Sequence, residues 1–358
     1  MRLPVMPPVS PMLSKPMREL PEREDVLYEP KWDGFRAVVF RDGAQLELGS
    51  RNERPLTRYF PELVESLGRG LPERCVLDGE IVIAGPDGLD FEALLQRIHP
   101  AESRVRLLSE RTPASFVAFD LLAVGDEDLR GTPFGARRAR LEKLLRRARP
   151  PLHLTPATRR YDVALAWLSR FEGAGLDGVM VKPLALPYLE GKREMLKVKH
   201  ARTADCVVAG FRWHKDGEGI GSLLLGLHDA AGNLQYAGAV AGFNAAVRRA
   251  LVQELEPLRM RSTQGHPWAA VMPSEDVAGR RPGGPSRWTA QRDMSWEPLR
   301  AERVIEVAYD HLQGERFRHV AKFVRWRPDR SPSSCTYAQL ESAVPTELSE
   351  VFGAAIDA

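Results

Sequence analysis

Apolar and polar positions alternate in two different ways along the first half of the chain, which predicts a mixture of strands and helices. Period-two or wholly apolar runs predict strands at residues 36–40, 75–83, 115–122 and 178–182. Amphipathic stretches predict helices at residues 54–67, 91–99, 135–149 and 162–173. The interleaving is not a regular βαβα series, so an α+β fold is favoured over a doubly wound parallel sheet.

The pattern changes near residue 203, where short strands are joined by glycine-rich turns. Strands are predicted at residues 206–213, 222–228, 234–242, 303–312 and 316–327. One helix is predicted at 245–258, and residues 261–298 form an irregular stretch rich in Pro, Gly, Ser and Trp. Short strands, one helix and a long loop are typical of a small OB-type β-barrel. We therefore expect two domains, residues 1–202 and 203–358.

The composition allows two ordinary cores, because the 358 residues are 43% hydrophobic. The net charge of +3 excludes a polybasic tail, although a local basic surface can still bind nucleic acid. Cysteine and histidine spacings predict neither a disulfide framework nor a zinc site. Residues 1–20 lack the apolar segment of a signal peptide, and no run approaches the ~18 apolar residues of a membrane helix. A soluble, cytoplasmic protein without a membrane partner is expected.

Lysine is rare in this chain, with 9 lysines among the 51 basic residues. Arginine is thus the usual cation, and a lysine indicates a place that needs a deprotonatable amine or a compact charge. Lys31 stands before a predicted strand, next to the turn Asp33-Gly34. Such a lysine is a candidate nucleophile, and the alternative is an ordinary solvated lysine at a strand entrance.

Six further motifs accompany Lys31 in a fixed order. The seven motifs are Lys31 to Arg36 (KxDGxR), Ser50-Arg51-Asn52, Asp78-Gly79-Glu80, Phe116 to Asp120 (FxxFD), Asp177 to Lys182 ((E/D)GxxxK), Lys197-Val198-Lys199 (KxK) and Arg327-Pro328-Asp329-Arg330 (RxDK). Each motif alone is weak, but seven in order are specific. The sequence resembles the covalent nucleotidyltransferase superfamily and, within it, the ATP-dependent DNA ligases, closest to the small bacterial C-type ligases.

The resemblance implies an ATP-grasp-like nucleotidyltransferase (adenylation) domain followed by an OB-fold domain. It also implies that Lys31 attacks the α-phosphorus of ATP and that AMP then passes from the lysine to the 5′-phosphate of nicked duplex DNA. The implied cofactors are ATP and Mg²⁺ or Mn²⁺. By the same resemblance, Glu29 accepts a hydrogen bond from the adenine amino group and so favours ATP over GTP.

Further roles follow from the resemblance for residues that surround the nucleotide. Arg36 and Arg51 contact the nucleotide and the 5′-phosphate of the nick, because a guanidinium can clamp a phosphate with two hydrogen bonds. Glu80 binds the ribose hydroxyls or the metal. Phe119 stacks on the purine, although an aromatic residue in an apolar strand is by default a core residue.

Lys182, Lys197 and Lys199 also belong to the expected nucleotide site. An ordinary lysine is almost wholly protonated at neutral pH, since its pKa is about 10.4. Lys197, Lys199 and a bound metal are therefore expected to lower the pKa of Lys31 and to offset the charge of the phosphoryl group in transfer.

Two carboxylates and the last motif complete the expected site. Glu80 and Asp177 are the expected ligands of Mg²⁺, which prefers oxygen ligands. Asp177 stands where many ligases carry glutamate, and this shorter side chain favours a contact through water. Arg327, Asp329 and Arg330 are expected to engage the β- and γ-phosphates, with Arg330 in place of the usual lysine.

Two basic stretches are candidates for contacts with the DNA backbone. Residues 316–330 carry six cations, predicted to form a row on one face of the barrel. Residues 137–149 carry seven cations on an amphipathic helix, for which a solvated face is the alternative. Glycines 217, 219 and 221 are expected to form a turn between strands.

Three other functions share parts of this pattern. An RNA-capping guanylyltransferase is disfavoured by Glu29, an RNA ligase is harder to dismiss, and a non-catalytic OB-type binder is disfavoured by the intact lysine motifs. For the ligase, the family suggests a monomer that acts in DNA repair, with a repair polymerase or an end-binding protein as partner.

Overall fold

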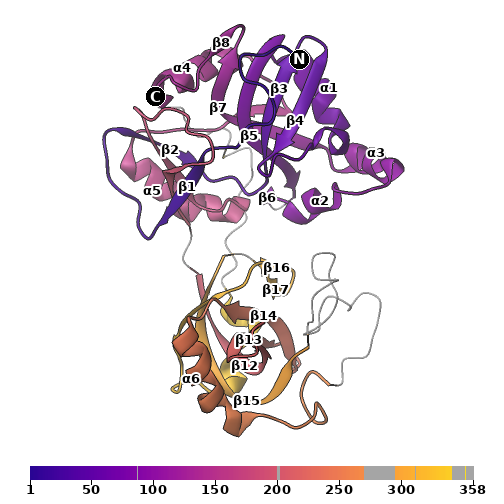
Figure 1. Ribbon diagram of the computed structural model, residues 1–358, viewed down its shortest axis with the longest axis vertical. Helices are drawn as coiled ribbons and strands as arrows, with labels where there is room; N and C mark the ends of the chain where they lie inside the picture. Colours follow the sequence, from indigo (N-terminus) through magenta and orange to yellow (C-terminus); the bar gives the residue numbers. More distant parts are fainter. Residues whose placement is uncertain (87, 200–201, 270–294, 311, 341–350, 352–358) are drawn as a thin grey trace. The chain divides into compact units, whose positions relative to one another are not determined.

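The computed structural model describes residues 1–86, 88–199, 202–269, 295–310, 312–340 and 351. The chain forms two compact units, the first comprising Met1–His200 with Ala343–Ala358 and the second Ala201–Ser342 (Figure 1). The sequence placed the division two residues later and assigned all of the C-terminus to the second domain. Val351 instead packs in a core cluster of the first unit.

The larger sheet of the first unit is antiparallel along its main path, with the order β4-β3-β5-β7-β8. Its strands are β3 (Phe35–Asp42), β4 (Gln45–Ser50), β5 (Arg74–Gly85), β7 (Ala114–Val124) and β8 (Glu127–Asp128), with β6 (Gly88–Leu89) paired to β5 and β9 (Leu152–Leu154) paired to β7. Both faces are covered, because Val39 and Val38, neighbours on β3, enter different core clusters.

The smaller sheet of the first unit has the order β1-β11-β10-β2. Its strands are β1 (Leu13–Met17), β2 (Val26–Pro30), β10 (Val179–Pro183) and β11 (Arg193–Val198). The sequence pattern did not predict β1, β2 or β4. All five residues of β2 are buried, so this strand shows no period-two alternation.

Helices cover the sheets of the first unit. They are α1 (Pro61–Gly70), α2 (Phe91–Gln96), α3 (Glu102–Arg111), α4 (Phe134–Leu145) and α5 (Tyr161–Arg170), with 3₁₀ turns η1 (Thr57–Tyr59) and η2 (Phe171–Ala174). The helix predicted at 54–67 is two elements, because Pro61 begins a new helix at its first turn. α1 packs on the larger sheet through Leu63 and Leu67, whereas α5 packs on the smaller sheet through Trp167.

The second unit is a small barrel that confirms the predicted OB type. Its main strands follow the order β14-β13-β12-β15-β18. They are β12 (Arg202–Trp213), β13 (Ile220–His228), β14 (Leu234–Ala241), β15 (Glu297–Tyr309) and β18 (Lys322–Trp326), accompanied by α6 (Ala245–Leu255) and the 3₁₀ turn η3 (Glu256–Leu258). The ends of the sheet meet where the Ala321 amide donates to the Ala239 carbonyl at 2.9 Å.

Two predictions for the second unit are corrected. The strand expected at 316–327 is interrupted, because β17 (Arg316–Phe317) pairs with β16 (Leu312–Gln313) and β18 begins only at Lys322. The six cations therefore do not form one row. The irregular stretch expected at 261–298 gives its last residues to β15, and its residues 270–294 lie outside the described part of the chain.

Of the glycines expected to form a turn, Gly217 and Gly219 lie between β12 and β13, whereas Gly221 is already the second residue of β13. Gly217 and Gly219 both have positive φ angles, 76° and 89°, which favour glycine. Among the described helices, none is long and apolar enough to cross a membrane.

Candidate active site

Lys31 follows the last residue of β2, and backbone hydrogen bonds fix it beside the start of β10. The Lys31 amide donates to the Gly178 carbonyl at 2.8 Å, and the Asp177 amide donates to the Lys31 carbonyl at 2.8 Å. Gly178 has a φ of 129°, and a Cβ there would lie 2.0 Å from the Val198 carbonyl oxygen. The glycine of the (E/D)GxxxK motif thus lets Lys31, Asp177 and β11 approach closely.

A second glycine brings the larger sheet to the same place. A Cβ on Gly34 would lie 2.2 Å from the Ile81 carbonyl oxygen, so the Asp33-Gly34 turn packs directly against β5. In the register of β3 with β5, Arg36 is then paired with Glu80. The KxDGxR and DGE motifs therefore meet through backbone packing.

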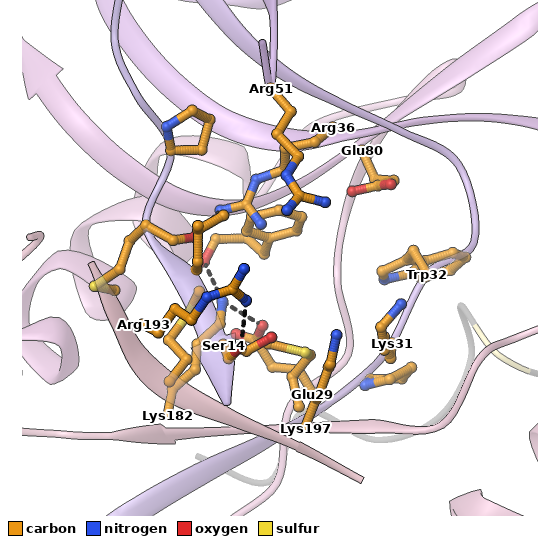
Figure 2. A pocket seen from close by; sticks show the side chains of 17 residues that line it. Ser14, Glu29, Lys31, Trp32, Arg36, Arg51, Glu80, Lys182, Arg193 and Lys197 are labelled. Atoms are coloured by element: carbon orange, nitrogen blue, oxygen red, sulfur yellow. Dashed lines mark hydrogen bonds and ion pairs between the residues drawn. The ribbon is translucent and has the colours of Figure 1, made fainter. Parts of the chain in front are cut away.

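A pocket lies beside Lys31, lined by both sheets of the first unit (Figure 2). Of the residues predicted from the sequence, it gathers Glu29, Lys31, Arg36, Arg51, Glu80, Phe119, Lys182 and Lys197. Others in its lining were not predicted, including Ser14, Trp32 and Arg193. Figure 2 shows the Lys31 and Lys197 side chains on one side of the pocket, with Arg36 and Arg51 together on another.

Asp177 holds two lysines beside the pocket. Lys31 Nζ forms an ion pair with Asp177 Oδ2, and Lys199 Nζ lies 3.1 Å from the same oxygen. The Asp177 side chain is 6% exposed, against 20% for Lys31 and 28% for Lys199. Burial and then the charges of Lys31 and Lys199 lower the pKa of Lys197, so positive charge is concentrated at this place.

A second carboxylate, Glu29, also holds two cations. Its Oε2 lies 2.6 Å from Lys182 Nζ, and its Oε1 accepts a hydrogen bond of 3.1 Å from Arg138 Nη1. All three side chains are at most 4% exposed. Lys182 Nζ also lies 4.5 Å from the centre of the Phe119 ring, so the predicted adenine-binding residues are in direct contact with one another.

A hydrogen-bond network fixes Arg36. Its Nε and Nη2 both donate to the carboxylate of Asp78 at 2.5 Å, and its guanidinium lies 4.5 Å from the centre of the Phe119 ring. The buried Tyr188 hydroxyl donates to Asp78 at 2.6 Å and accepts from the Met12 amide at 3.2 Å. Asp78 thus orients the arginine from behind, and Tyr188 in turn orients Asp78.

Glu80 and Asp177 are the two carboxylates expected to bind a metal. Burial raises the pKa of Glu80 to about 7, although Arg36 and Lys31 oppose the shift. Within the described residues, no three carboxylate, cysteine or histidine side chains cluster. Mg²⁺ is commonly held by one or two carboxylates together with phosphates and water, so this donor set fits a metal that arrives with a nucleotide.

The last motif forms a cluster of its own in the second unit. Arg327 Nη1 donates to both carboxylate oxygens of Asp205 at 2.9 Å, and Arg330 Nε lies 3.1 Å from Asp205 Oδ2. Arg327 also donates to Asp329 and holds its pKa near 2. The sequence missed Asp205, because nothing in its neighbourhood distinguishes it from other acidic residues.

The first cations of the basic helix predicted at 135–149 do not form the exposed surface that contact with DNA would require. Arg137 is fully buried and donates to both oxygens of Asp120, at 2.8 and 2.9 Å, while Arg138 reaches Glu29. The predicted apolar stripe is confirmed, since Leu141 and Leu145 are buried. The local sequence, rich in arginine and leucine, gave no sign that Arg137 and Arg138 point inward.

Comparisons with known proteins cover most of the chain. Residues 11–199 match the family model of the ATP dependent DNA ligase domain, and residues 216–330 match that of the ATP dependent DNA ligase C terminal region. The chain is 58% identical to DNA ligase C2 of Mycolicibacterium smegmatis, over 96% of this chain and 97% of that protein. It is 57% identical to DNA ligase C of Mycobacterium tuberculosis, over 98% and 99%.

Solved structures agree in fold. A Lig E DNA ligase superposes with a TM-score of 0.55 at 18% identity, over 88% of this chain and 99% of that one. The predicted nucleotidyltransferase domain followed by an OB-fold domain is thereby confirmed. From these matches and from the close full-length relatives, the chain belongs to the ATP-dependent DNA ligases, near the small bacterial C-type enzymes.

Proposed function

We propose that Lys31 is the nucleophile of this ligase and carries AMP as a phosphoramidate. The observation behind this proposal is the position of Lys31 in the pocket, paired with Asp177 and close to Lys197 and Lys199. In the first step, Nζ loses a proton and bonds to the α-phosphorus of ATP. The bond from that phosphorus to the bridging oxygen breaks, and pyrophosphate leaves.

Two further displacements complete the reaction. An oxygen of the DNA 5′-phosphate attacks the phosphorus of lysyl-AMP, the P–N bond breaks, and the lysine amine is regenerated. The 3′-hydroxyl of the nick then attacks the 5′-phosphorus, a phosphodiester forms, and AMP leaves. Each step passes through a charged phosphoryl group, which the cations of the pocket stabilise.

The surrounding residues divide the work of binding. We assign the phosphates to Lys197, Lys199 and Arg51, because Lys197 experiences the positive charges of Lys199 and Arg51 as well as that of Lys31. Arg36 presents a guanidinium already oriented by Asp78. Arg327, Asp329 and Arg330 form the proposed contact to the departing pyrophosphate, and Asp205 orients the guanidinium groups of the two arginines.

We assign the recognition of the base to Glu29. An ionised carboxylate only accepts hydrogen bonds, so Glu29 can accept from the adenine amino group but opposes the carbonyl of guanine. Lys182 contacts both Glu29 and Phe119, and we assign Phe119 the stacking contact with the purine.

Glu80 and Asp177 are the residues that would hold Mg²⁺ or Mn²⁺. A bound divalent ion would offset the phosphate charge and favour the neutral form of the Lys31 amine. Glu80 must lose its proton before it can act as a ligand, which links its pKa of about 7 to metal binding.

Covalent labelling tests the nucleophile. Purified protein is stripped of AMP with pyrophosphate, incubated with Mg²⁺ and [α-³²P]ATP, denatured and run on a gel. We expect a label in the wild type and in Lys15→Ala, an exposed lysine of β1, but none in Lys31→Ala. A label retained by Lys31→Ala would assign the nucleophile to another residue. A label from [α-³²P]GTP equal to that from ATP would contradict the role of Glu29.

The cellular role rests on family membership. We propose a monomeric, cytoplasmic enzyme of DNA repair that acts with a repair polymerase or an end-binding protein. Light scattering of the purified chain, with and without nicked duplex DNA, tests the monomer. A mass of two chains on one nick would contradict it.

A further inference from the structure

Arg138 contacts the base-reading end of the pocket from outside. It lies on α4 and is absent from the pocket lining, and its side chain is 4% exposed. Its Nη1 donates to Glu29 at 3.1 Å, its Nη2 to the Thr155 carbonyl at 2.9 Å, and its Nε to Glu142 at 2.6 Å. Such a buried guanidinium with three different acceptors has little freedom to move.

These contacts constrain the orientation of the Glu29 carboxylate. Arg138 takes one oxygen and Lys182 takes the other, so rotation of the carboxylate would break both interactions. Each carboxylate oxygen has two lone pairs, and one on each remains for a ligand. The pair of cations therefore sets the direction in which Glu29 can accept a hydrogen bond.

The same arginine connects Glu29 to the segment that carries the nucleophile. The Thr155 carbonyl accepts from Arg138, and the Thr155 hydroxyl accepts from Trp32 Nε1 at 2.8 Å. Trp32 is the residue after Lys31 and lines the pocket. Arg138 is thus linked directly to Glu29 and, through Thr155, to the side chain of Trp32.

We propose that Arg138 is a positioning residue that aims Glu29 at the purine 6-position and thereby sets the preference for ATP over GTP. The inference rests on the proposed function of Glu29 as the residue that reads the base. Adenine presents a donor at this position and guanine an acceptor, so discrimination requires a carboxylate held in one orientation. Without Arg138, Glu29 keeps Lys182 as a partner but loses the constraint on its other oxygen.

The test removes Arg138 and the 6-amino group of the purine separately. Arg138→Met and the wild type are compared on ATP and on purine riboside triphosphate, which lacks the 6-amino group. For each, kcat/KM of self-adenylation is measured by pyrophosphate release. In the wild type we expect ATP to be favoured by roughly 10- to 100-fold, the range of a hydrogen bond to a charged group. In Arg138→Met the factor should fall below about 3-fold, because the amino group no longer meets an aligned acceptor.

This ratio separates positioning from a merely structural role. Both substrates are measured on one preparation, so the folded fraction cancels. If Arg138→Met lowers kcat/KM for the two triphosphates by the same factor, the residue supports only the fold and the inference is overturned. Arg138→Lys keeps the charge but loses the fork of donors, so an intermediate ratio is expected.

Arg137→Met is the matched control. Arg137 is a buried neighbour on α4 whose guanidinium pairs with Asp120 instead of Glu29. We expect this variant to lose stability while it keeps the wild-type preference for ATP over purine riboside triphosphate. A preference lost equally in both variants would mean that any disturbance of α4 has the same result, which contradicts a specific role for Arg138.

Glu29→Ala distinguishes the two levels of the proposal. If Glu29→Ala retains the wild-type ratio, Glu29 does not read the base, and the proposed function of that residue fails. If Glu29→Ala abolishes the ratio but Arg138→Met preserves it, Glu29 reads the base without help, and only the role of Arg138 fails. Loss of the ratio in both variants supports both statements.

Discussion

Two carboxylates beside the pocket, Glu29 and Asp177, each pair with two cations, and the proposed base-reading end and nucleophile end that they form differ in burial. At the base-reading end, Glu29, Lys182 and Arg138 are all at most 4% exposed. At the nucleophile end, Asp177 is 6% exposed but its lysines are 20% and 28% exposed. The buried ion pairs of Glu29 are therefore held in place, whereas the more exposed ion pairs of Asp177 can exchange partners with an incoming ligand.

The difference shows how burial assigns a role to an ion pair. A buried charge that loses its partner keeps its desolvation penalty, so the Glu29 end has to remain intact and suits recognition. A partly exposed pair is weak, because water competes for both charges, so Lys31 can leave Asp177 to react. Substitutions in the Glu29 ion pairs should therefore lower stability, and substitutions in the Asp177 ion pairs should lower the rate of self-adenylation.

The largest effect on stability is expected from Lys182→Met. Breaking a buried ion pair leaves the Glu29 carboxylate with Arg138 alone, which should lower the free energy of unfolding by about 3 kcal/mol. Urea denaturation measures the loss, and Lys192→Met, at an exposed lysine, is the control. A loss below about 1 kcal/mol would show that the ion pairs of Glu29 contribute no more to stability than surface ion pairs do.

Lys199→Gln should show the opposite profile. Self-adenylation at saturating ATP should slow by roughly 100-fold, because one preorganised charge beside the transferred phosphoryl group is lost. The free energy of unfolding should change by under about 1 kcal/mol, since the pair with Asp177 is partly exposed. Single-turnover labelling gives the rate and urea denaturation the stability. If Lys199→Gln is unstable but fully active, the ion pair with Asp177 supports the fold instead of the reaction, which would contradict the prediction.

A smaller effect is expected from pH through Glu80. The carboxylate is ionised above its pKa of about 7, so half-maximal labelling should need about tenfold more Mg²⁺ at pH 6 than at pH 8. Because folding raises this pKa, Glu80 stabilises the fold while protonated, and that contribution is lost as the pH rises from about 4.5 to about 7. Glu80→Gln should flatten both dependences; an unchanged Mg²⁺ dependence would remove Glu80 from the metal site.

The smallest effect is expected from Lys15→Gln. Lys15 pairs with Glu194 at 3.3 Å, but the two side chains are 55% and 40% exposed. Its loss should change the free energy of unfolding by less than about 0.5 kcal/mol and leave the labelling rate within error. A larger change in either quantity would mean that exposure does not rank the ion pairs of this protein.

Several strands near the pocket could be predicted, and so could most of the charged residues that face it. The strands predicted at 75–83 and 115–122 became β5 and β7, because long apolar runs leave few alternatives. The short strand β2 was missed although it ends beside Lys31. A fully buried five-residue strand carries no periodicity, and its place in the sheet depends on pairing with β10.

The sequence by itself determined the family of this protein and the residues proposed for its chemistry, because Lys31, its cationic neighbours and two close-packed glycines occur in short motifs whose order is visible along the chain. Only the tertiary structure decided which charges meet. Arg138 reaches Glu29 across 109 positions and Tyr188 reaches Asp78 across 110. Such pairings depend on how α4 and the segment after β10 pack on the sheets. An arginine that packing buries has the same local sequence as one that remains in water.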